Sequence, residues 1–429
     1  MSQAVPTKSR KPLRNFALHL HPVNISKEAI RFNRTFGLGG MAALLFIIQA
    51  FTGILLRFLY EPVPEKAYDS ILFIQNEVLF GQFVRNIHHW SGIFFVLVTF
   101  LHLLRTFYAQ SYYSPRRINW VIGVVLLFIV ILSNFTGYLL PWDQLAFWAI
   151  TVSTNMLEYF PLVGGWLQTA IRGGAEVGPA TLLNFYNFHT GILPLSLIAL
   201  MGYHFWRVRK AKGVALPESQ AGAPKINTWP DLVLKEVSVA LVLIAIILLI
   251  SVFGDAPLLD RANPAYSPNP AKAPWYFMGV QELLLHFHPF FAVVVIPVLF
   301  FVAMFCLPYY KIKDINPGTW FHSEKGKKLT VYCAILALVV TPLTILLDEY
   351  VLDFEKWLDG LPLWLSTGLV PFVLLVVGCW LLVLILRKRF KADKVEVIIS
   401  MFTMMVVSYA VLTIVGIAFR GPGMVLFSG

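Results

Sequence analysis

The feature that most constrains this chain is a series of apolar runs, each long enough to cross a lipid bilayer. A membrane-spanning helix needs about 20 residues, because it rises only ~1.5 Å per residue. Nine such runs occur, near residues 37–58, 83–105, 118–140, 181–206, 232–253, 289–310, 328–347, 364–386 and 396–418. With 58% hydrophobic and 13% charged residues, the chain lacks the polar surface that a soluble protein needs. We therefore expect an all-α, polytopic transmembrane helix bundle of about nine spans.

The intervals 141–180 and 254–288 are longer than the other connections and are rich in Trp, Pro and Gly. They are too hydrophobic to be ordinary solvated loops. We expect short helices in both intervals that lie on the surface of the membrane-embedded bundle.

Basic residues fall mainly in alternate loops. When the N-terminal arm and every second loop after it are assigned to one side, that side holds most of the 34 Lys and Arg residues. The opposite loops hold most of the acids, as between Asp348 and Asp359. The positive-inside rule then predicts a cytoplasmic N-terminus, and nine spans place the segment from Arg420 onward outside. This alternation argues against nucleic acid as the reason for the net charge of +11.

Ionisable side chains are costly inside a bilayer, so those within the expected spans are functional candidates. The second span contains His88 and His102, and the fourth contains His189 and His204. Fourteen residues of helix rise ~21 Å and make nearly four turns, so His88 and His102 share one face at two depths. The histidines of the fourth span, fifteen residues apart, do almost the same.

Both of these spans run from outside to inside, so His88 matches His189 in depth and His102 matches His204. Paired imidazoles at two levels predict two bis-histidine sites for non-covalent haem b, stacked across the bilayer. A lone histidine in a span is more often a hydrogen-bond partner between helices, but four at these spacings favour haem. We assign His88 rather than His89, because its spacing places it on the face of His102. The sequence contains no CxxCH motif, so it does not predict a covalently attached c-type haem.

Four glycines of the first and third spans repeat the histidine period: Gly39, Gly53, Gly123 and Gly137. Glycine lets a flat macrocycle approach the backbone, although glycines that pack helices are the alternative interpretation. Arg85, one turn before His88, and Arg105, just after His102, are placed to pair with haem propionates.

These residues resemble cytochrome b of the cytochrome bc1 and b6f complexes over roughly residues 15–390, and the b6 type most closely. Residues 85–91 (RNIHHWS) are similar to the second helix of that family, and the separation of His189 and His204 is also b6-like. Residues 136–144 (TGYLLPWDQ), which include Trp142, resemble the border of the family's outer quinol site.

The resemblance implies a diheme cytochrome b subunit of a quinol:electron-acceptor oxidoreductase, a quinol–cytochrome c or plastocyanin-type reductase. Quinol would be oxidised at an outer site, electrons would cross through both haems to an inner quinone site, and the reaction would contribute to proton translocation. Two alternatives remain open. One is a non-bifurcating diheme quinol dehydrogenase that works with a multihaem or other redox partner, and the other is a secondary transporter with buried histidines.

The outer pocket departs from the family pattern. The family's Pro-Glu-Trp-Tyr motif falls at residues 273–276 (APWY), so Pro274 stands where the family has glutamate. Glu282 is the replacement we expect as proton acceptor, about two helical turns beyond Trp275 on the same face. A surface carboxylate is the alternative for Glu282.

Quinol oxidation must release protons outside, so it needs carboxylates near an outer, partly dry pocket. Tyr276 and Asp143 complete the expected catalytic set, and Trp142 and Trp275 are expected to border the quinol. His286 shares the helix face of the proposed proton acceptor.

The inner side carries three further expectations from the resemblance. Gly37 stands where b6 proteins have the cysteine that holds an additional haem, so a covalent third haem is not expected. Arg209 aligns with a basic residue after the fourth helix, and Asp231 matches an acid at the inner quinone site. Either could equally be ordinary interfacial charge.

The resemblance implies that the chain is a fusion of two units that are separate subunits in b6f complexes. Residues 1–215 correspond to the b6-like diheme four-helix domain, and residues 225–390 to the C-terminal, subunit IV-like helical domain. Residues 213–224 (GVALPESQAGAP) have the composition of a linker. Residues 391–429 add a ninth span, either a docking helix for another subunit or a stabilising helix, and an outer tail.

The resemblance also implies partners and a location. We expect a Rieske iron–sulfur protein and a c-type cytochrome as outer electron acceptors, a homodimer of complexes, and membrane lipid around the bundle. The quinone is expected to be a menaquinone and the location a bacterial inner membrane.

Overall fold

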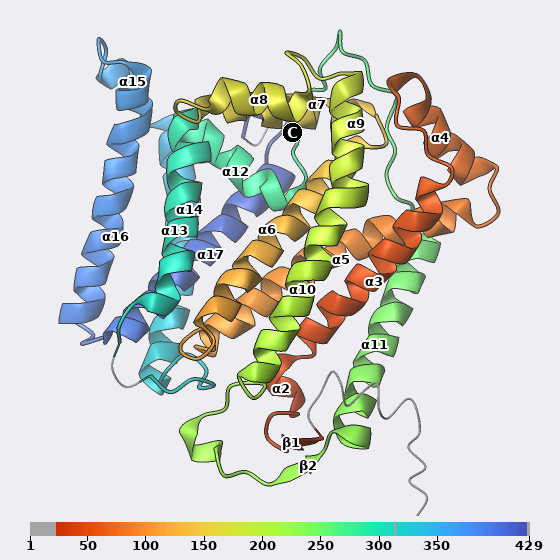
Figure 1. Cartoon of the computed structure of the whole chain (residues 1–429). Helices are drawn as coiled ribbons and strands as arrows, with labels where there is room; N and C mark the ends of the chain where they lie inside the picture. The colour runs from red at the N-terminus through yellow and green to blue at the C-terminus, as the bar shows by residue number, and fades with distance from the viewer. Residues whose placement is uncertain (1–22, 313–314, 427–429) are drawn as a thin grey trace, which may run out of the picture.

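The computed structural model describes residues 23–312 and 315–426 as an almost entirely helical bundle (Figure 1). Within these ranges, nine helical segments are long and apolar enough to cross a membrane, which confirms the expected class of fold. They are α3 (Leu38–Arg57), α5 (Gly81–Tyr108), α6 (Arg117–Leu139), α9 (Pro179–Asn187) continued through a π-helical turn by α10 (Leu193–Lys210), α11 (Thr228–Phe253), α13 (Ile296–Cys306) with the preceding turn Phe290–Val295, α14 (Glu324–Tyr350), α16 (Val370–Lys388) with the preceding turn Trp364–Leu369, and α17 (Lys394–Ala418).

Short elements connect these spans at the two ends of the bundle. They are β1 (Asn24–Ser26), α2 (Phe32–Thr35), α4 (Pro64–Asn76), α7 (Gln144–Asn155), α8 (Gly164–Arg172), β2 (Lys225–Asn227), α12 (Trp275–His286) and α15 (Phe354–Trp357), with 3-10 turns at Met156–Tyr159, Glu218–Gln220, Leu307–Tyr309 and Pro422–Met424. β1 and β2 pair antiparallel, with Ile25 opposite Ile226, so they tie the chain before α3 to the chain before α11.

The expectation of surface helices is confirmed for residues 141–180, which form α7 and α8, but it is wrong for much of residues 254–288. Only α12 is helical there, and residues 254–274 run as irregular chain. Five prolines in that stretch explain the difference, since proline lacks the N–H that a helix interior uses and clashes with the preceding turn.

The two ends of the bundle are chemically different. Figure 1 shows α4, α8 and α15 at one end, with the described C-terminal segment, and the β1–β2 pair at the other. The loops at the β1–β2 end carry the basic runs, so we call it the inner end and the opposite one the outer end. Residues 1–22 lie outside the described ranges, so the side of the N-terminal arm stays a prediction.

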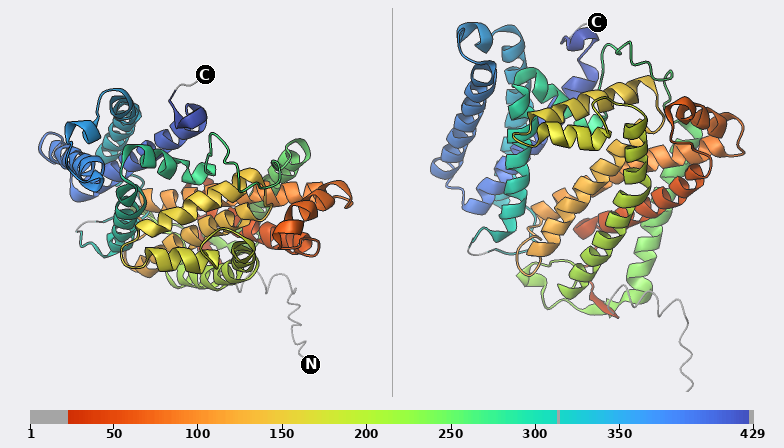
Figure 2. Two further views of the ribbon diagram at one scale, coloured as in Figure 1. Left: turned by 90° about the horizontal axis from the view of Figure 1, so that it is seen from above. Right: turned by 45° about the horizontal axis from the view of Figure 1, so that its top comes forward.

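The first four spans and α11 enclose one apolar core. Leu45, Phe95, Val130 and Ile247, from α3, α5, α6 and α11, are among its buried residues. A second core at the inner end joins α5 and α6 to α13 and α17, where the rings of Phe107 and Phe402 stack 3.8 Å apart. The second core joins the two halves of the chain, and Figure 2 shows the helices of both halves together in one bundle.

The ninth span, α17, lies inside the bundle. It packs along α14 and against α12, and 39% of its most apolar stretch is buried, against 6% for α16. Figure 1 shows α16 at the edge of the molecule. This packing favours the stabilising interpretation of α17 over a helix kept free for another subunit.

Candidate functional site

The outer histidine pair joins α5 to the turn that precedes α10. The imidazole centroids of His88 and His189 lie 6.1 Å apart, with the ring planes inclined by 76°. Two imidazoles that bind one metal ion from opposite sides place their centroids ~6 Å apart, because each metal–nitrogen bond is about 2 Å. His89 packs against Trp90 instead, with ring centroids 5.1 Å apart. The spacing argument therefore selected the histidine that faces the fourth span.

The inner pair repeats this arrangement on the same two helical segments. The centroids of His102 and His204 lie 6.3 Å apart at 73°. α5 on one side, and α10 with the turn that precedes it on the other, thus carry paired imidazoles at two depths, as the helical spacing predicts.

Each of the four glycines lies against one of these rings. A Cβ added at Gly53 would come within 3.2 Å of His88, and one at Gly137 within 2.6 Å of His189. Gly39 and Gly123 face His102 and His204 in the same way, at 3.3 and 3.6 Å. A side chain at these positions would therefore occupy the space beside an imidazole.

Neighbouring helices hold the outer imidazoles through their Nδ1 atoms. Thr52 Oγ1 lies 2.8 Å from Nδ1 of His88, and the carbonyl of Ser133 lies 2.8 Å from Nδ1 of His189, with Thr136 Oγ1 at 3.3 Å. Such contacts fix the ring orientation and leave Nε2 to bind a metal. Sequence reasoning did not foresee these contacts, although Thr136 belongs to the motif at residues 136–144, because they depend on how α3 and α6 pack.

The donor set, the ring separations and the glycine-lined space fit a haem iron at each level. The two arginines assigned to propionates are anchored to backbone. Arg85 donates to the carbonyls of Ala256 and Pro257, at 2.8 and 2.6 Å, and Arg105 donates to the carbonyl of Arg34 at 2.5 Å. Their pairing with haem stays a prediction.

Asp143 caps α7 and binds the irregular segment that leads to α12. Its Oδ1 accepts from the backbone of Ala146 at 2.9 Å, and its Oδ2 accepts from Leu259 at 3.1 Å. Burial raises the pKa of Asp143, against the lowering effect of these backbone donors. The buried Trp142 beside it adopts a left-handed backbone conformation, with φ of 53°. This turn therefore fixes the position of the outer motif.

α12 begins at Trp275, directly after Pro274, and its first turn faces α6 and α17. The ring of Phe277 packs edge-on against Phe135 of α6, with centroids 5.5 Å apart, and Tyr409 of α17 donates to the carbonyl of Tyr276. Burial raises the pKa of Tyr276 above its usual value. The APWY segment is therefore held between two spans.

Glu282 is fully buried on the face of α12 that meets α17. It contacts His286, with 3.3 Å between Oε1 and Nε2, and Arg420, with 2.7 Å between Oε1 and Nη2. Burial raises the pKa of the Glu282 carboxyl, but the hydrogen bonds from these two residues outweigh it and hold the pKa below its usual value. His286, expected on the same helix face, contacts Glu282 directly, whereas Asp143 makes its contacts elsewhere.

Sequence reasoning did not identify Arg420 as a partner of this carboxylate. It donates also to Glu349 of α14, at 2.8 Å, and to the carbonyl of Met424. The sequence does show a lone arginine directly after an apolar span, which marks Arg420 as a candidate, but residue spacing does not predict which carboxylate it contacts.

Two open cavities in the described part of the chain lie at the inner end. One, of about 520 Å³, lies between the residues that follow β1, strand β2 and the start of α11, and it is lined by Lys27, Glu28, Ile30, Arg31, Ile226, Asp231 and Lys235. It places Asp231 in a cavity, and Arg209 is not among its lining residues. Gly37, at the start of α3, has φ of 67°, a left-handed conformation that favours glycine.

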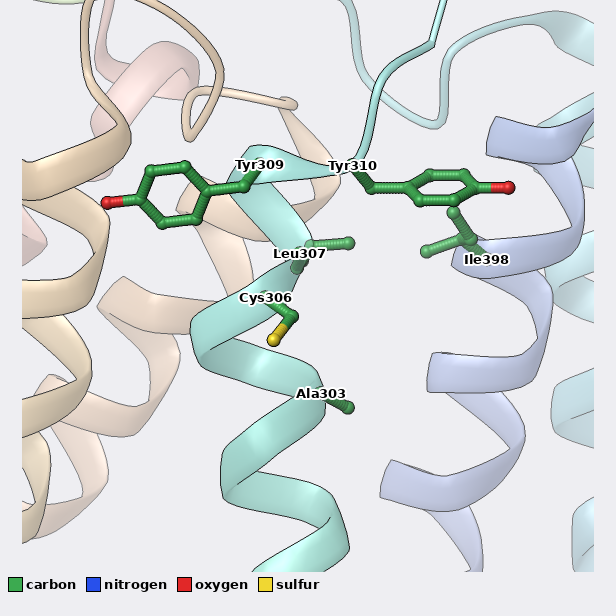
Figure 3. A pocket seen from close by; sticks show the side chains of 6 residues that line it. All are labelled: Ala303, Cys306, Leu307, Tyr309, Tyr310 and Ile398. Atoms are coloured by element: carbon green, nitrogen blue, oxygen red, sulfur yellow. The ribbon is translucent and has the colours of Figure 1, made fainter.

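The other cavity, of about 480 Å³, lies between the inner end of α13 and α17. Figure 3 shows Tyr310 directed toward Ile398 of α17 and Tyr309 directed away from it. Its lining is mostly apolar, and no expectation from the sequence pointed to it.

Comparison with known proteins places this architecture in a family. The family model described as cytochrome b/b6/petB matches residues 25–212. Cytochrome b6 of Heliomicrobium gestii is 42% identical over 197 residues, which is 46% of this chain and 90% of that protein. Cytochrome b6 of Synechococcus elongatus is 41% identical over 180 residues, 42% of this chain and 83% of that protein.

The whole fold also has a counterpart among solved structures. A chain of a hyperthermophilic respiratory Complex III matches with a TM-score of 0.68 and 22% identity, over 95% of this chain and 96% of that one. At this identity the likeness concerns the fold, and it extends through the C-terminal half. Together with the b6 relatives, these findings show that the chain belongs to the cytochrome b/b6 family of membrane-embedded, haem-binding electron-transport proteins.

Proposed function

We propose that this chain is the diheme cytochrome b subunit of a bc-type quinol oxidoreductase. It oxidises quinol at the outer end, moves electrons to an inner quinone site and contributes to proton translocation. The observation that carries this proposal is the presence of two facing histidine pairs, at two depths, on the same two helical segments.

His88 and His189 hold the outer haem b, and His102 and His204 hold the inner one. When bound, each haem iron supplies a site that accepts and passes on one electron. The chain orients the outer imidazoles through the contacts at Nδ1 and keeps side chains out of the neighbouring space with glycine. Arg85 and Arg105 are assigned to the propionates.

Quinol binds near Trp142, Trp275 and Tyr276, at the outer end. Its oxidation releases protons, and Glu282 is the carboxylate assigned to receive them in place of the family's motif glutamate. The contact between Phe277 and Phe135 supports this location, because Phe135 is adjacent to Thr136, which touches the ring of His189.

The cavity that contains Asp231 is the candidate inner quinone site, with Arg209 as a further basic residue at the same end. The outer electron acceptors are a Rieske iron–sulfur protein and a c-type cytochrome, and the complex is a homodimer. The location is a bacterial inner membrane with the N-terminus cytoplasmic, and menaquinone is the quinone.

A diheme quinol dehydrogenase that passes both electrons to one multihaem partner would use the same haem path. Pro274, at the position of the family's glutamate, is the observation that favours it. The subunits that copurify with the chain discriminate: a Rieske protein supports the bc type, and a multihaem protein without a Rieske subunit supports the alternative.

The proposal is tested by the haem content of the purified complex. We expect two non-covalent haem b per chain, both reduced when a menaquinol analogue is added. A reduced-minus-oxidised spectrum without b-haem bands would overturn the assignment and favour a transporter.

A further inference from the structure

The segment after the ninth span inserts an arginine beneath α12. Arg420 is 3% exposed, and its Nε and Nη2 donate to Glu282, which has no exposed surface. Two glycines permit this approach: a Cβ at Gly416 would come within 2.6 Å of Met278, and one at Gly279 within 2.6 Å of Tyr409. α12 and α17 are therefore packed closely around the buried ion pair.

A second branch leads from the same carboxylate toward the surface. Glu282 Oε1 lies 3.3 Å from Nε2 of His286, and Nδ1 of His286 lies 2.6 Å from Oδ2 of Asp348. Side-chain exposure rises along this series, from 0% for Glu282 to 9% for His286 and 26% for Asp348. The series thus connects a buried carboxylate to the outer solvent.

Charge compensation alone does not explain this second branch. Arg420 is shared between Glu282 and Glu349, so a charged His286 offsets part of the remaining negative charge, but charge balance does not require a carboxylate at each of its ring nitrogens. In the described part of the chain, Glu349 is the one other charged residue that contacts the network, through Arg420. The histidine instead bridges two carboxylates, the arrangement in which an imidazole can accept a proton on one nitrogen and donate from the other.

We propose that Glu282, His286 and Asp348 form a proton-release relay to the outer surface, and that Arg420 is a positioning residue that holds Glu282 ionised and ready to receive a proton. This inference rests on the proposed function, since quinol oxidation supplies the protons. Trp275, seven residues before Glu282, shares its face of α12, whereas Phe277 on another face packs against Phe135 near the outer histidine pair.

Each proton that enters the relay is balanced by one that leaves it. The imidazolium of His286 gives its Nδ1 proton to Asp348, which releases it to water. The neutral imidazole then moves its remaining proton from Nε2 to Nδ1 by tautomer exchange through water, which leaves Nε2 free. Glu282 takes a proton from the quinol and passes it to Nε2, which restores the imidazolium. The network ends each cycle with the charge it had at the start.

The electrostatics of the network support an ionised Glu282 and a charged imidazole. The pKa of His286 is raised to about 9: burial lowers it, but hydrogen bonds and charge from Asp348 and Glu282 outweigh that effect. The same contacts, with Arg420, hold the pKa of Glu282 below its usual value.

Two neighbouring carboxylates of α14 provide a matched test. In the purified complex, Asp348→Asn removes the relay's exit, whereas Glu349→Gln removes a carboxylate that contacts Arg420 only. We expect Asp348→Asn to slow quinol-driven haem reduction roughly tenfold or more, as loss of a proton-transfer group does, and to raise its solvent deuterium isotope effect. Glu349→Gln should stay within about twofold of the parent. Equal slowing by both variants, or by neither, overturns the relay.

The role of Arg420 is tested by infrared spectroscopy, independently of turnover. Arg420→Gln should shift the titration of the Glu282 carboxyl to higher pH, detected as a protonated C=O band that Glu282→Gln abolishes. Arg420→Lys should restore the parental titration, and an unshifted band in Arg420→Gln overturns the assignment. If the parent complex binds both haems but no quinol reduces them, the proposed function fails, whereas the infrared result still stands.

Discussion

Nη2 of Arg420 lies 2.7 Å from Oε1 of Glu282, although 138 residues separate them in the chain. The contact forms because α17 returns through the bundle to the outer end and turns its following segment under α12. Lys272 donates to the carbonyl of Ile417, and the side chain of Asn269 accepts from the backbone of Gly423. These hydrogen bonds connect the segment before α12 to the end of α17 and the segment that follows it. The ninth span thus helps to build the outer end of the protein.

We predict that removing one partner of this buried pair destabilises the protein far more than removing both. Glu282→Leu leaves the buried Arg420 with Glu349 alone, and Arg420→Met leaves the buried Glu282 with His286 alone; breaking a buried pair in this way costs up to about 3–5 kcal/mol. The double variant should recover most of that loss, because two apolar side chains of similar size can pack there. Denaturation of the detergent-solubilised protein measures the cycle, and additive losses in the double variant would contradict a direct pair.

The raised pKa of His286 predicts a stability that depends on pH. A histidine whose pKa is about 9 in the folded state, against an ordinary value near 6.5, stabilises fully below about pH 6.5. That contribution is lost as the pH rises toward 9. The thermal midpoint should therefore fall across this window in the parent and stay flatter in His286→Gln. A parallel fall in both proteins would show that other groups cause it.

We predict that the two haem sites can be emptied separately. His88→Ala should remove the outer haem and leave the inner one, and His102→Ala should do the reverse, because each iron would lose one of its two imidazoles. Redox titration of the b-haem absorbance should show one remaining component, with a different midpoint in each variant. His89→Ala serves as the control, since this ring packs against Trp90 and should leave both haems in place.

The helical period of the sequence predicts the facing histidine pairs, whereas contacts that depend on packing across the chain could not be predicted. The depths of His88 and His102 result from fourteen residues of regular helix, so their pairing with α10 could be anticipated. The meeting of Glu282 and Arg420 depends on where α17 lies among α12 and α14, which no local pattern encodes.

The irregular segment before α12 was predictable in principle. Its five prolines exclude regular helix, whereas its apolar composition favours a packed surface helix. Asp143, in contrast, makes one contact that the sequence predicts and one that it does not. An aspartate before an apolar helix is a recognisable cap, yet its second contact, with Leu259, arises from chain folded across more than a hundred residues.

The glycine beside the inner pair permits a prediction that separates haem binding from helix packing. Alanine at Gly123 would meet only His204 among the described protein atoms, at an ordinary contact distance of 3.6 Å, so the polypeptide itself should tolerate the change. If the glycine is present to admit a macrocycle, Gly123→Ala should lower the inner haem content while the thermal stability of the haem-free protein is unchanged. Gly202→Ala on α10, where an added Cβ meets nothing within 4 Å, is the matched control and should retain both haems. Full inner haem occupancy in Gly123→Ala would assign this glycine to packing between helices, and the case for the inner site would then rest on the facing rings of His102 and His204 alone.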